Sequence, residues 1–215
     1  MYRLRVAFFR GEPIRYISHL DLLRLWERAL RRARIPLAYT QGFNPHPRLS
    51  LAAPLSVGVV GEQELMDLVL TEPMEPAHFL AEVRRQMPEG LRLLAAEEVE
   101  WNAPALPAQV RAAEYRAELS PEVDTEGLED KVAALLQATT LRRERRRDKE
   151  TKRYDLRPLI EDLRVERTPE SVSLWMRLRA DPSGTGRPDE VLVALGIPPE
   201  RASIRRLRLI LDEGR

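Results

Sequence analysis

Apolar residues change their spacing along the first half of the chain, and each change marks an element. Tyr2–Phe9 opens with apolar–polar alternation and closes with β-forming residues, which predicts a strand. Apolar residues then recur at helical spacing behind Ser18, a natural N-cap. This predicts a helix that ends near Arg34, because Pro36 disfavours helical geometry at the preceding residue. The apolar stripe expected on this helix consists of Leu20, Leu23, Trp26, Leu30 and Ala33.

The remaining pattern predicts a repeated order of elements. An extended segment follows at 37–40 and resumes at 49–53 after a loop. Strands are then expected at 64–71 and 91–99, with a helix over 76–87. This gives the order β-α-β-β-α-β, which is typical of ferredoxin-like domains. The second half nearly repeats it, with strands at 114–119, 141–147, 171–179 and 203–211 and helices at 125–137 and 188–195. We therefore expect an α+β protein of two tandem ferredoxin-like (βαββαβ) domains, 1–100 and 110–215, with a linker at 101–109 and a basic hairpin at 142–153.

Composition narrows the functional classes. The chain of 215 residues contains no cysteine, which excludes disulfides, cysteine-based zinc sites and cysteine-ligated iron–sulfur clusters on this chain. It lacks an apolar run of roughly 18 residues, and its N-terminus lacks the apolar core and cleavage site of a signal peptide. We expect a cytoplasmic protein that has no membrane partner and carries no cofactor or metal of its own.

The net charge of +1 conceals a segregation of charge along the chain. Residues 1–58 carry ten arginines against three acids, whereas residues 59–100 carry ten acids against three arginines. Residues 142–153 hold eight basic residues against three acids. Such segregation indicates localised electrostatic fields, and a basic field is suited to phosphate groups.

The first candidate motif is RYISHLDLLR, residues 15–24, at the start of the predicted helix. Arginines on the polar side of this helix, together with the amides of its first turn, are suited to contact phosphates. The alternative is an ordinary amphipathic helix with a solvated basic face. The nucleic-acid-binding candidates of this segment are Arg15, Tyr16, Arg24, Arg28 and Arg31.

The second candidate motif is TQGFNPHPR, residues 40–48. Its two prolines stiffen the loop, and Gly42 permits a positive φ. Phe43 either stacks on a base or anchors the loop to the core. The alternative for the whole segment is a rigid connector, but a connector seldom needs so many hydrogen-bonding side chains. The binding candidates here are Gln41, Phe43, Asn44 and Arg48.

Histidines and the basic hairpin supply the remaining candidates. His19 and His46 would serve as general base and acid if they lie close together. A metal site is not expected, because the spacing of His19 and Asp21 on a helix turns their side chains apart. The hairpin is either a solvated tip or a non-specific phosphate contact. Its candidates are Arg145, Arg146, Arg147 and Lys149.

Three segments carry a resemblance to a known family. RYISHLDLLRLWERALRRARIPLAYTQGFNPHPRLSLAAPLSVGV, KRYDLRPLIEDL and GRPDEVLVAL resemble the signatures of a bacterial family of radical SAM-linked, or radical SAM-associated, proteins of unknown function. In that family the domain occurs free or fused to a radical SAM protein, and it tends to be encoded near ribonuclease and ribosomal-protein genes. This chain lacks the CxxxCxxC motif that a radical SAM enzyme needs. The resemblance therefore implies an accessory part, with a radical SAM protein encoded separately as its partner.

Together these features favour an RNA-binding accessory module that presents tRNA or rRNA to a radical SAM enzyme. One alternative is a metal-independent endoribonuclease that uses His19 and His46, with Arg48 stabilising the charged phosphorane. Another is a protein-interaction scaffold, in which the acidic block at 59–141 meets a basic partner. The first of these hypotheses predicts salt-sensitive RNA binding.

Overall fold

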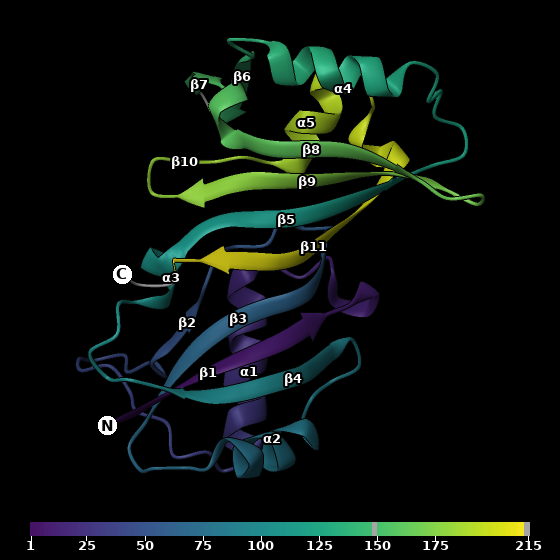
Figure 1. The fold of residues 1–215 in the computed structure, drawn as a ribbon. Helices are drawn as coiled ribbons and strands as arrows, with labels where there is room; N and C mark the ends of the chain where they lie inside the picture. The colour runs from purple at the N-terminus through teal and green to yellow at the C-terminus, as the bar shows by residue number, and fades with distance from the viewer. Residues whose placement is uncertain (148–149, 213–215) are drawn as a thin grey trace. The chain divides into compact units, whose positions relative to one another are not determined.

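The computed structural model describes residues 1–147 and 150–212 (Figure 1). The chain divides into two compact units, Met1–Val110 and Arg111–Arg215. Each unit combines an antiparallel sheet with a small number of helices. The expected α+β class is therefore confirmed. Among the described residues, no helix is both long enough and apolar enough to cross a membrane.

Unit 1 contains the first block of strands and helices. Its elements are β1 (Tyr2–Arg10), η1 (Glu12–Ile14), α1 (His19–Arg32), β2 (Leu49–Leu51), β3 (Val60–Leu70), α2 (Pro76–Arg84), β4 (Leu91–Val99) and α3 (Leu106–Gln109). β1 pairs antiparallel with both β3 and β4, and β2 pairs antiparallel with β3. The strands of this unit therefore lie in the order β4–β1–β3–β2.

The core of unit 1 lies between one face of the sheet and helices α1 and α2. Alternate residues of β1 point into this core. The rings of Phe8 and Trp26 pack edge to face, with 5.1 Å between their centroids. The buried residues of α1 are Leu22, Trp26, Ala29 and Leu30. The predicted stripe is wrong at Leu20, which is 63% exposed. Leucines occur on several sides of the first two turns, so helical spacing alone did not decide which would face the sheet.

The structure differs from one expected strand, and it groups the expected linker with unit 1. Residues 37–40 do not form a strand; Leu37 and Tyr39 make isolated bridges to Leu70 and Pro47. Residues 101–109, expected as a linker, belong to unit 1. The physical reason is that the guanidinium of Arg3 donates hydrogen bonds to the carbonyl oxygens of Ala103 and Pro104, both at 2.7 Å, while Leu106 is buried.

Unit 2 contains the second block of strands and helices. Its elements are β5 (Val110–Leu119), α4 (Leu128–Gln137), β6 (Arg142–Arg147), β7 (Glu150–Asp155), η2 (Arg157–Leu159), β8 (Ile160–Arg167), β9 (Val172–Asp181), β10 (Gly184–Thr185), α5 (Pro188–Ala194), η3 (Pro199–Arg201) and β11 (Ala202–Leu211). β9 pairs antiparallel with both β5 and β8, and β11 lies on the other side of β5. The order is β11–β5–β9–β8, and β6 and β7 form a separate two-stranded hairpin.

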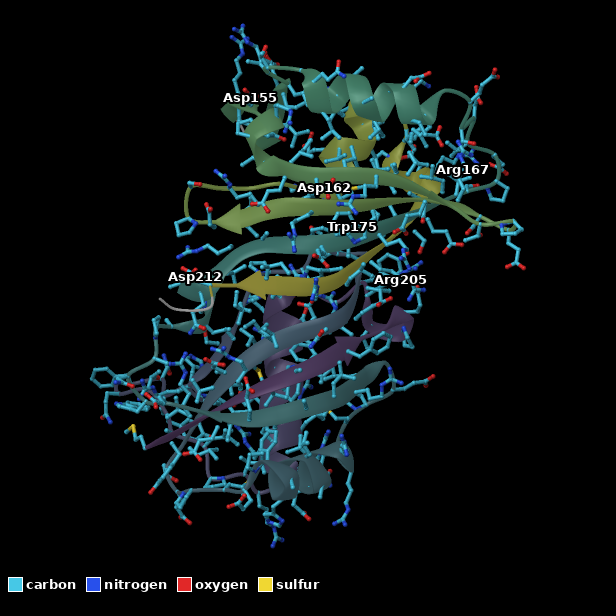
Figure 2. The ribbon with its side chains drawn as sticks, in the orientation of Figure 1. Asp155, Asp162, Arg167, Trp175, Arg205 and Asp212 are labelled. Carbon is cyan, nitrogen blue, oxygen red and sulfur yellow. The ribbon has the colours of Figure 1, made fainter. Side chains whose placement is uncertain are left out.

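Hydrogen bonds fix the base of this hairpin and the end of β8. The carboxylate of Asp155 accepts hydrogen bonds from the backbone N–H groups of Leu141 at 2.7 Å and Arg157 at 3.0 Å. At the other end of β8, Arg167 donates to Glu129 in α4 at 2.7 Å. Both Asp155 and Arg167 are marked in Figure 2. Asp155, which belongs to the KRYDLRPLIEDL segment, therefore has a structural role at the base of the hairpin.

Candidate functional site

The TQGFNPHPR segment forms a closed loop at the end of β3. Its base is held by hydrogen bonds from Arg48 N to Ala38 O and from Thr40 N to His46 O, both 2.9 Å. The end of β3 holds the base of the loop on both sides. Ala38 N donates to Val69 O at 2.8 Å, and Val69 N donates to Arg48 O at 3.1 Å. The loop is therefore a defined projection from unit 1.

The tip of this loop carries an aromatic ring that the unit does not cover. Phe43 has a relative exposure of 107%, and Gln41 and Asn44 are also exposed. Gly42 has a φ of +126°, a conformation that side-chain-bearing residues rarely adopt. The interpretation of Phe43 as an anchor to the core is thus wrong. Phe43 therefore presents its whole ring to solvent at the loop tip.

At the base of the loop, Arg48 lies over a tryptophan. Its guanidinium carbon is 5.5 Å from the ring centroid of Trp101, which is 51% exposed. The pair borders an open cavity of about 430 Å³, whose lining includes Arg3, Thr40, Arg48, Ser50, Asp67 and Trp101. This volume lies in the range of ordinary ligand pockets. We call the loop 38–48 and this cavity together the loop–Trp101 site.

The floor of the cavity includes Arg3 and Asp67, and Asp67 is shared with Arg5, which lies beside the cavity lining. Arg3 Nε donates to Asp67 Oδ2 at 2.8 Å, and Arg5 Nε donates to Asp67 Oδ1 at 2.9 Å. The Asp67 side chain is only 5% exposed, and both arginine side chains are nearly buried. This cluster of two guanidiniums and one carboxylate carries an excess positive charge beside the cavity, and that charge favours an anionic ligand.

The RYISHLDLLR motif is explained in part by helix capping. Asp21 N donates to Ser18 Oγ at 3.2 Å, and the Ser18 hydroxyl donates back to Asp21 Oδ2 at 2.7 Å. Ser18 thus caps the N-terminus of α1 through its side chain. The hydrogen bond from Ser18, assisted by Arg24, lowers the pKa of the Asp21 carboxyl. Ser18 and Asp21 therefore serve the start of α1 directly.

The arginines of α1 have local partners. Arg24 pairs with Asp21 at 3.2 Å and Arg31 with Glu27 at 2.6 Å, while Arg28 Nε donates to the carbonyl oxygen of Arg24. All three arginine side chains are exposed, and exposed pairs of this kind contribute little to stability. These arginines thus lie on an exposed face of α1, a position that both interpretations predicted.

Arg15 and Tyr16 lie just before α1 and contact each other. The Arg15 guanidinium lies 4.8 Å from the Tyr16 ring centroid, and its Nη2 donates to the Tyr16 hydroxyl at 2.8 Å. Arg15 also pairs with Glu12. Tyr16 is 68% exposed. This aromatic–guanidinium pair therefore faces solvent at the N-terminal end of α1.

His19 and His46 are not brought together. His19 opens α1, a helix of 14 residues that is about 20 Å long. After the C-terminal end of α1, Pro36 O accepts a hydrogen bond from Thr71 N, which directly follows β3. The loop that carries His46 projects from this same end of β3. The two histidines therefore lie at opposite ends of α1 and cannot serve one phosphate. The geometry gives no support to the endoribonuclease alternative.

The other titratable candidates add no site. His78 lies exposed on α2. Within residues 1–147 and 150–212, no group of three His, Asp or Glu side chains is placed to hold a metal ion. In the basic hairpin, the described Arg153 pairs with Glu144 at 2.7 Å. The candidates Arg145, Arg146 and Arg147 lie outside the part of the chain whose side chains are described, and Lys149 lies outside the described residues altogether.

Sequence reasoning missed Arg3, Asp67 and Trp101 of the loop–Trp101 site, and also Arg5 beside it. Arg3 and Arg5 alternate on one face of β1, which is a recognisable signal for a charged sheet face. Trp101 lay in the expected linker, and no spacing related it to Arg48. Only the folded chain brings this tryptophan to the loop.

Comparison with known proteins gives a family but little fold information. A solved structure ascribed to a glycine cleavage system transcriptional repressor aligns over 98% of each chain, with 11% sequence identity and a TM-score of 0.24. A likeness at that score carries no argument. No curated protein matches the chain. A family described as "Uncharacterized protein conserved in bacteria (DUF2344)" matches residues 3–188. Because this match spans most of the sequence, the chain belongs to the conserved bacterial family DUF2344.

Proposed function

We propose that the chain is an RNA-binding accessory module that works with a separately encoded radical SAM enzyme in the modification of tRNA or rRNA. The observation that carries the RNA-binding part is the Arg48 guanidinium over the half-exposed ring of Trp101, beside a cavity with a basic floor. In this proposal the module acts in the cytoplasm and needs no cofactor of its own.

The chemistry of the loop–Trp101 site fits an unpaired nucleotide. A base stacks on an exposed aromatic ring with a gain of about 1–3 kcal/mol, and the gain depends little on which base it is. Arg48 then contacts the adjacent phosphate, since its guanidinium offers several donors in one plane. Phe43 at the loop tip offers a second ring to a neighbouring base. Single-stranded RNA suits this arrangement better than a duplex, whose bases are stacked on each other.

The proposal extends to the fold. We take each unit to be a ferredoxin-like domain, because each has the element order β-α-β-β-α-β once the β6–β7 insertion, α3 and the short β10 are set aside. The antiparallel orders β4–β1–β3–β2 and β11–β5–β9–β8 support this assignment. Four-stranded sheets of this kind bind single-stranded RNA in other proteins by presenting aromatic side chains.

The radical SAM partner rests on the sequence resemblance alone. Residues 15–59, 152–163 and 186–195 resemble the signatures of the radical SAM-linked family, and the chain has no cysteine to ligate an iron–sulfur cluster. The redox chemistry therefore belongs to the partner in this proposal. The role of the chain is then to hold the RNA while the partner reacts with it.

A protein-interaction role is favoured by one observation near α1. Tyr16, Leu20 and Val57 are 68%, 63% and 60% exposed. Tyr16 and Val57 are held near each other by the backbone, because their chain neighbours are hydrogen-bonded: Gly58 N donates to Arg15 O at 2.8 Å. Large exposed apolar side chains are typical of protein contacts. A scaffold function would use this surface, and it is compatible with an RNA-binding accessory module that docks on an enzyme.

The test is RNA binding by the full chain across a salt series. Fluorescence anisotropy of a labelled single-stranded RNA of about 12 nucleotides is measured for the wild type, Arg48→Ala and Trp101→Leu. We expect binding that weakens steeply with salt, and a loss of about tenfold in each variant. Arg85→Ala, which removes another exposed arginine with a local acidic partner, is the matched control and should leave the affinity unchanged. Wild-type protein that shows no salt-sensitive binding would refute the proposal.

A further inference from the structure

Unit 2 presents a tryptophan on the face of its sheet opposite the apolar core. Leu174 and Met176 on β9 are fully buried, and Trp175 between them points to the other face and is partly exposed. Figure 2 marks Trp175 on β9, which lies between β5 and β8. An aromatic ring therefore occupies the middle of a polar sheet face, where no packing in the core requires it.

Arginines of both neighbouring strands flank this ring. Trp175 is in register with Arg164 on β8 and with Arg116 on β5. The Arg164 guanidinium carbon lies 5.2 Å from the centroid of the Trp175 ring. This repeats, on a different unit and in a different structural setting, the pairing of Arg48 with Trp101. Cross-strand register, rather than a loop, places the groups here.

Carboxylates around the ring hold the guanidiniums in position. Arg116 pairs with Glu166 at 2.9 Å, and Arg164 pairs with Asp162. Further along the same face, Glu114 accepts hydrogen bonds from Arg208 Nε at 2.7 Å and Arg177 Nη2 at 2.9 Å. These pairs place four guanidiniums and three carboxylates around the ring. We call this face, with Trp175 at its centre, the Trp175 platform.

The Arg164 guanidinium that lies over the Trp175 ring can be displaced with little loss of free energy. The Arg164 side chain is 68% exposed, and its acidic partner lies two residues away on the same strand. An exposed pair of this kind contributes between about 0 and 1 kcal/mol. An RNA base that takes the place of the guanidinium on the ring gains stacking energy, while Arg164 remains close enough to contact the attached phosphate.

We propose that the Trp175 platform is a second binding site for single-stranded RNA, in which one unpaired base stacks on Trp175 and the flanking arginines contact its phosphates. This inference rests on the proposed function, because it takes RNA as the ligand. It adds that unit 2 binds RNA through its sheet face, whereas unit 1 binds through the loop–Trp101 site.

The experiment compares two replacements of the same ring in the full chain. Trp175→Phe keeps an aromatic face, and Trp175→Leu keeps apolar bulk without one. Anisotropy of labelled oligouridine of about 12 nucleotides is expected to show an affinity loss of about tenfold for Leu and less than about threefold for Phe. Arg164→Glu, an exposed change that leaves the core intact, is expected to weaken binding as much as Trp175→Leu. Arg85→Glu is its charge-matched control and should have a much smaller effect.

The outcomes separate this inference from the proposed function. If the wild type binds oligouridine and only Trp101 and Arg48 variants weaken it, the Trp175 platform is refuted and the proposed function stands. If only Trp175 and Arg164 variants weaken binding, the platform stands and the loop–Trp101 site is refuted. If the wild type does not bind, both are refuted. Equal losses for Trp175→Leu and Trp175→Phe, with Arg164→Glu unaffected, would show that the ring is structural and would also overturn the inference.

Discussion

The guanidinium of Arg48 lies 5.5 Å from the ring centroid of Trp101, although one residue closes a loop before β2 and the other follows β4. The contact joins a positive charge to a half-exposed aromatic ring at the mouth of a cavity with a basic floor. These are the two groups that an unpaired nucleotide needs, one for its base and one for its phosphate.

Replacing Arg48 by lysine and by alanine separates charge from planarity. Lysine keeps the positive charge but loses the flat guanidinium that matches the indole ring and phosphate oxygens. We expect Arg48→Lys to retain the salt dependence of RNA binding with a reduced affinity. Arg48→Ala is expected to lower the slope of log K against log salt by about 0.7, the value for one phosphate contact on a single strand. Equal slopes in the wild type and Arg48→Ala would show that Arg48 does not contact a phosphate.

Removing the ring of Phe43 is expected to affect RNA binding without affecting stability. Phe43 is fully exposed, so Phe43→Ser takes no apolar surface out of the core. Thermal denaturation should therefore be unchanged, while the RNA affinity falls by about tenfold because one stacking contact is lost. Phe79→Leu is the contrasting variant: it alters a buried ring and should lower the melting temperature. A lowered melting temperature in Phe43→Ser would contradict the exposed position of the ring.

Much of the fold was predictable because each strand and helix carries a local signal. Ser18 marks the start of α1, and alternation in β1 separates Leu4 and Val6, which face the core, from Arg3 and Arg5. The stripe of α1 was less predictable, since Leu20 and Leu22 are equally apolar and only packing against the sheet selects Leu22. Local patterns thus determined the elements better than they determined the buried faces.

The candidate site was predictable only where its residues are neighbours in sequence. The loop with Phe43 and Arg48 was recognisable from its composition, and the structure shows it as a defined projection. Trp101 was not recognisable, because Arg3 fixes the segment that carries it through hydrogen bonds to carbonyl groups. The sequence offered His19 and His46 as a general base and acid, but the length of α1 separates them. Long-range contacts of this kind leave no periodic signal in one sequence.

Neutralising Asp67 is expected to destabilise unit 1 strongly. Asp67→Asn leaves Arg3 and Arg5 nearly buried without their shared carboxylate, and breaking a buried ion pair in this way costs about 3–5 kcal/mol. Urea denaturation should show this loss in the free energy of unfolding. Glu82→Gln, which breaks the exposed pair with Arg85, should cost less than about 1 kcal/mol. Similar small losses in both variants would show that the Asp67 cluster does not stabilise the unit.

The stability of unit 2 is expected to depend on pH through Glu114. The hydrogen bond from Arg208, with its charge and with Arg177, lowers the pKa of the Glu114 carboxyl below its usual value of 4.5. A lowered pKa in the folded state gives stability that is present above 4.5 and is lost as the pH falls through the folded value. In urea titrations at a series of acidic pH values, Glu114→Gln should therefore be less stable than the wild type near neutral pH. The difference should shrink below pH 4.5. A difference independent of pH would contradict the ionised Glu114 cluster.

The most direct test of the loop–Trp101 site uses the fluorescence of its own tryptophan. Trp175→Phe leaves Trp101 as the exposed indole, because Trp26 is fully buried. Unlabelled single-stranded RNA is titrated into this variant, and binding is followed independently by anisotropy with labelled RNA. We predict that the tryptophan emission is quenched in step with RNA binding, and that the quenching is absent when Trp101→Leu is added. Binding by anisotropy with no change in tryptophan emission would contradict the claim that a base stacks on Trp101.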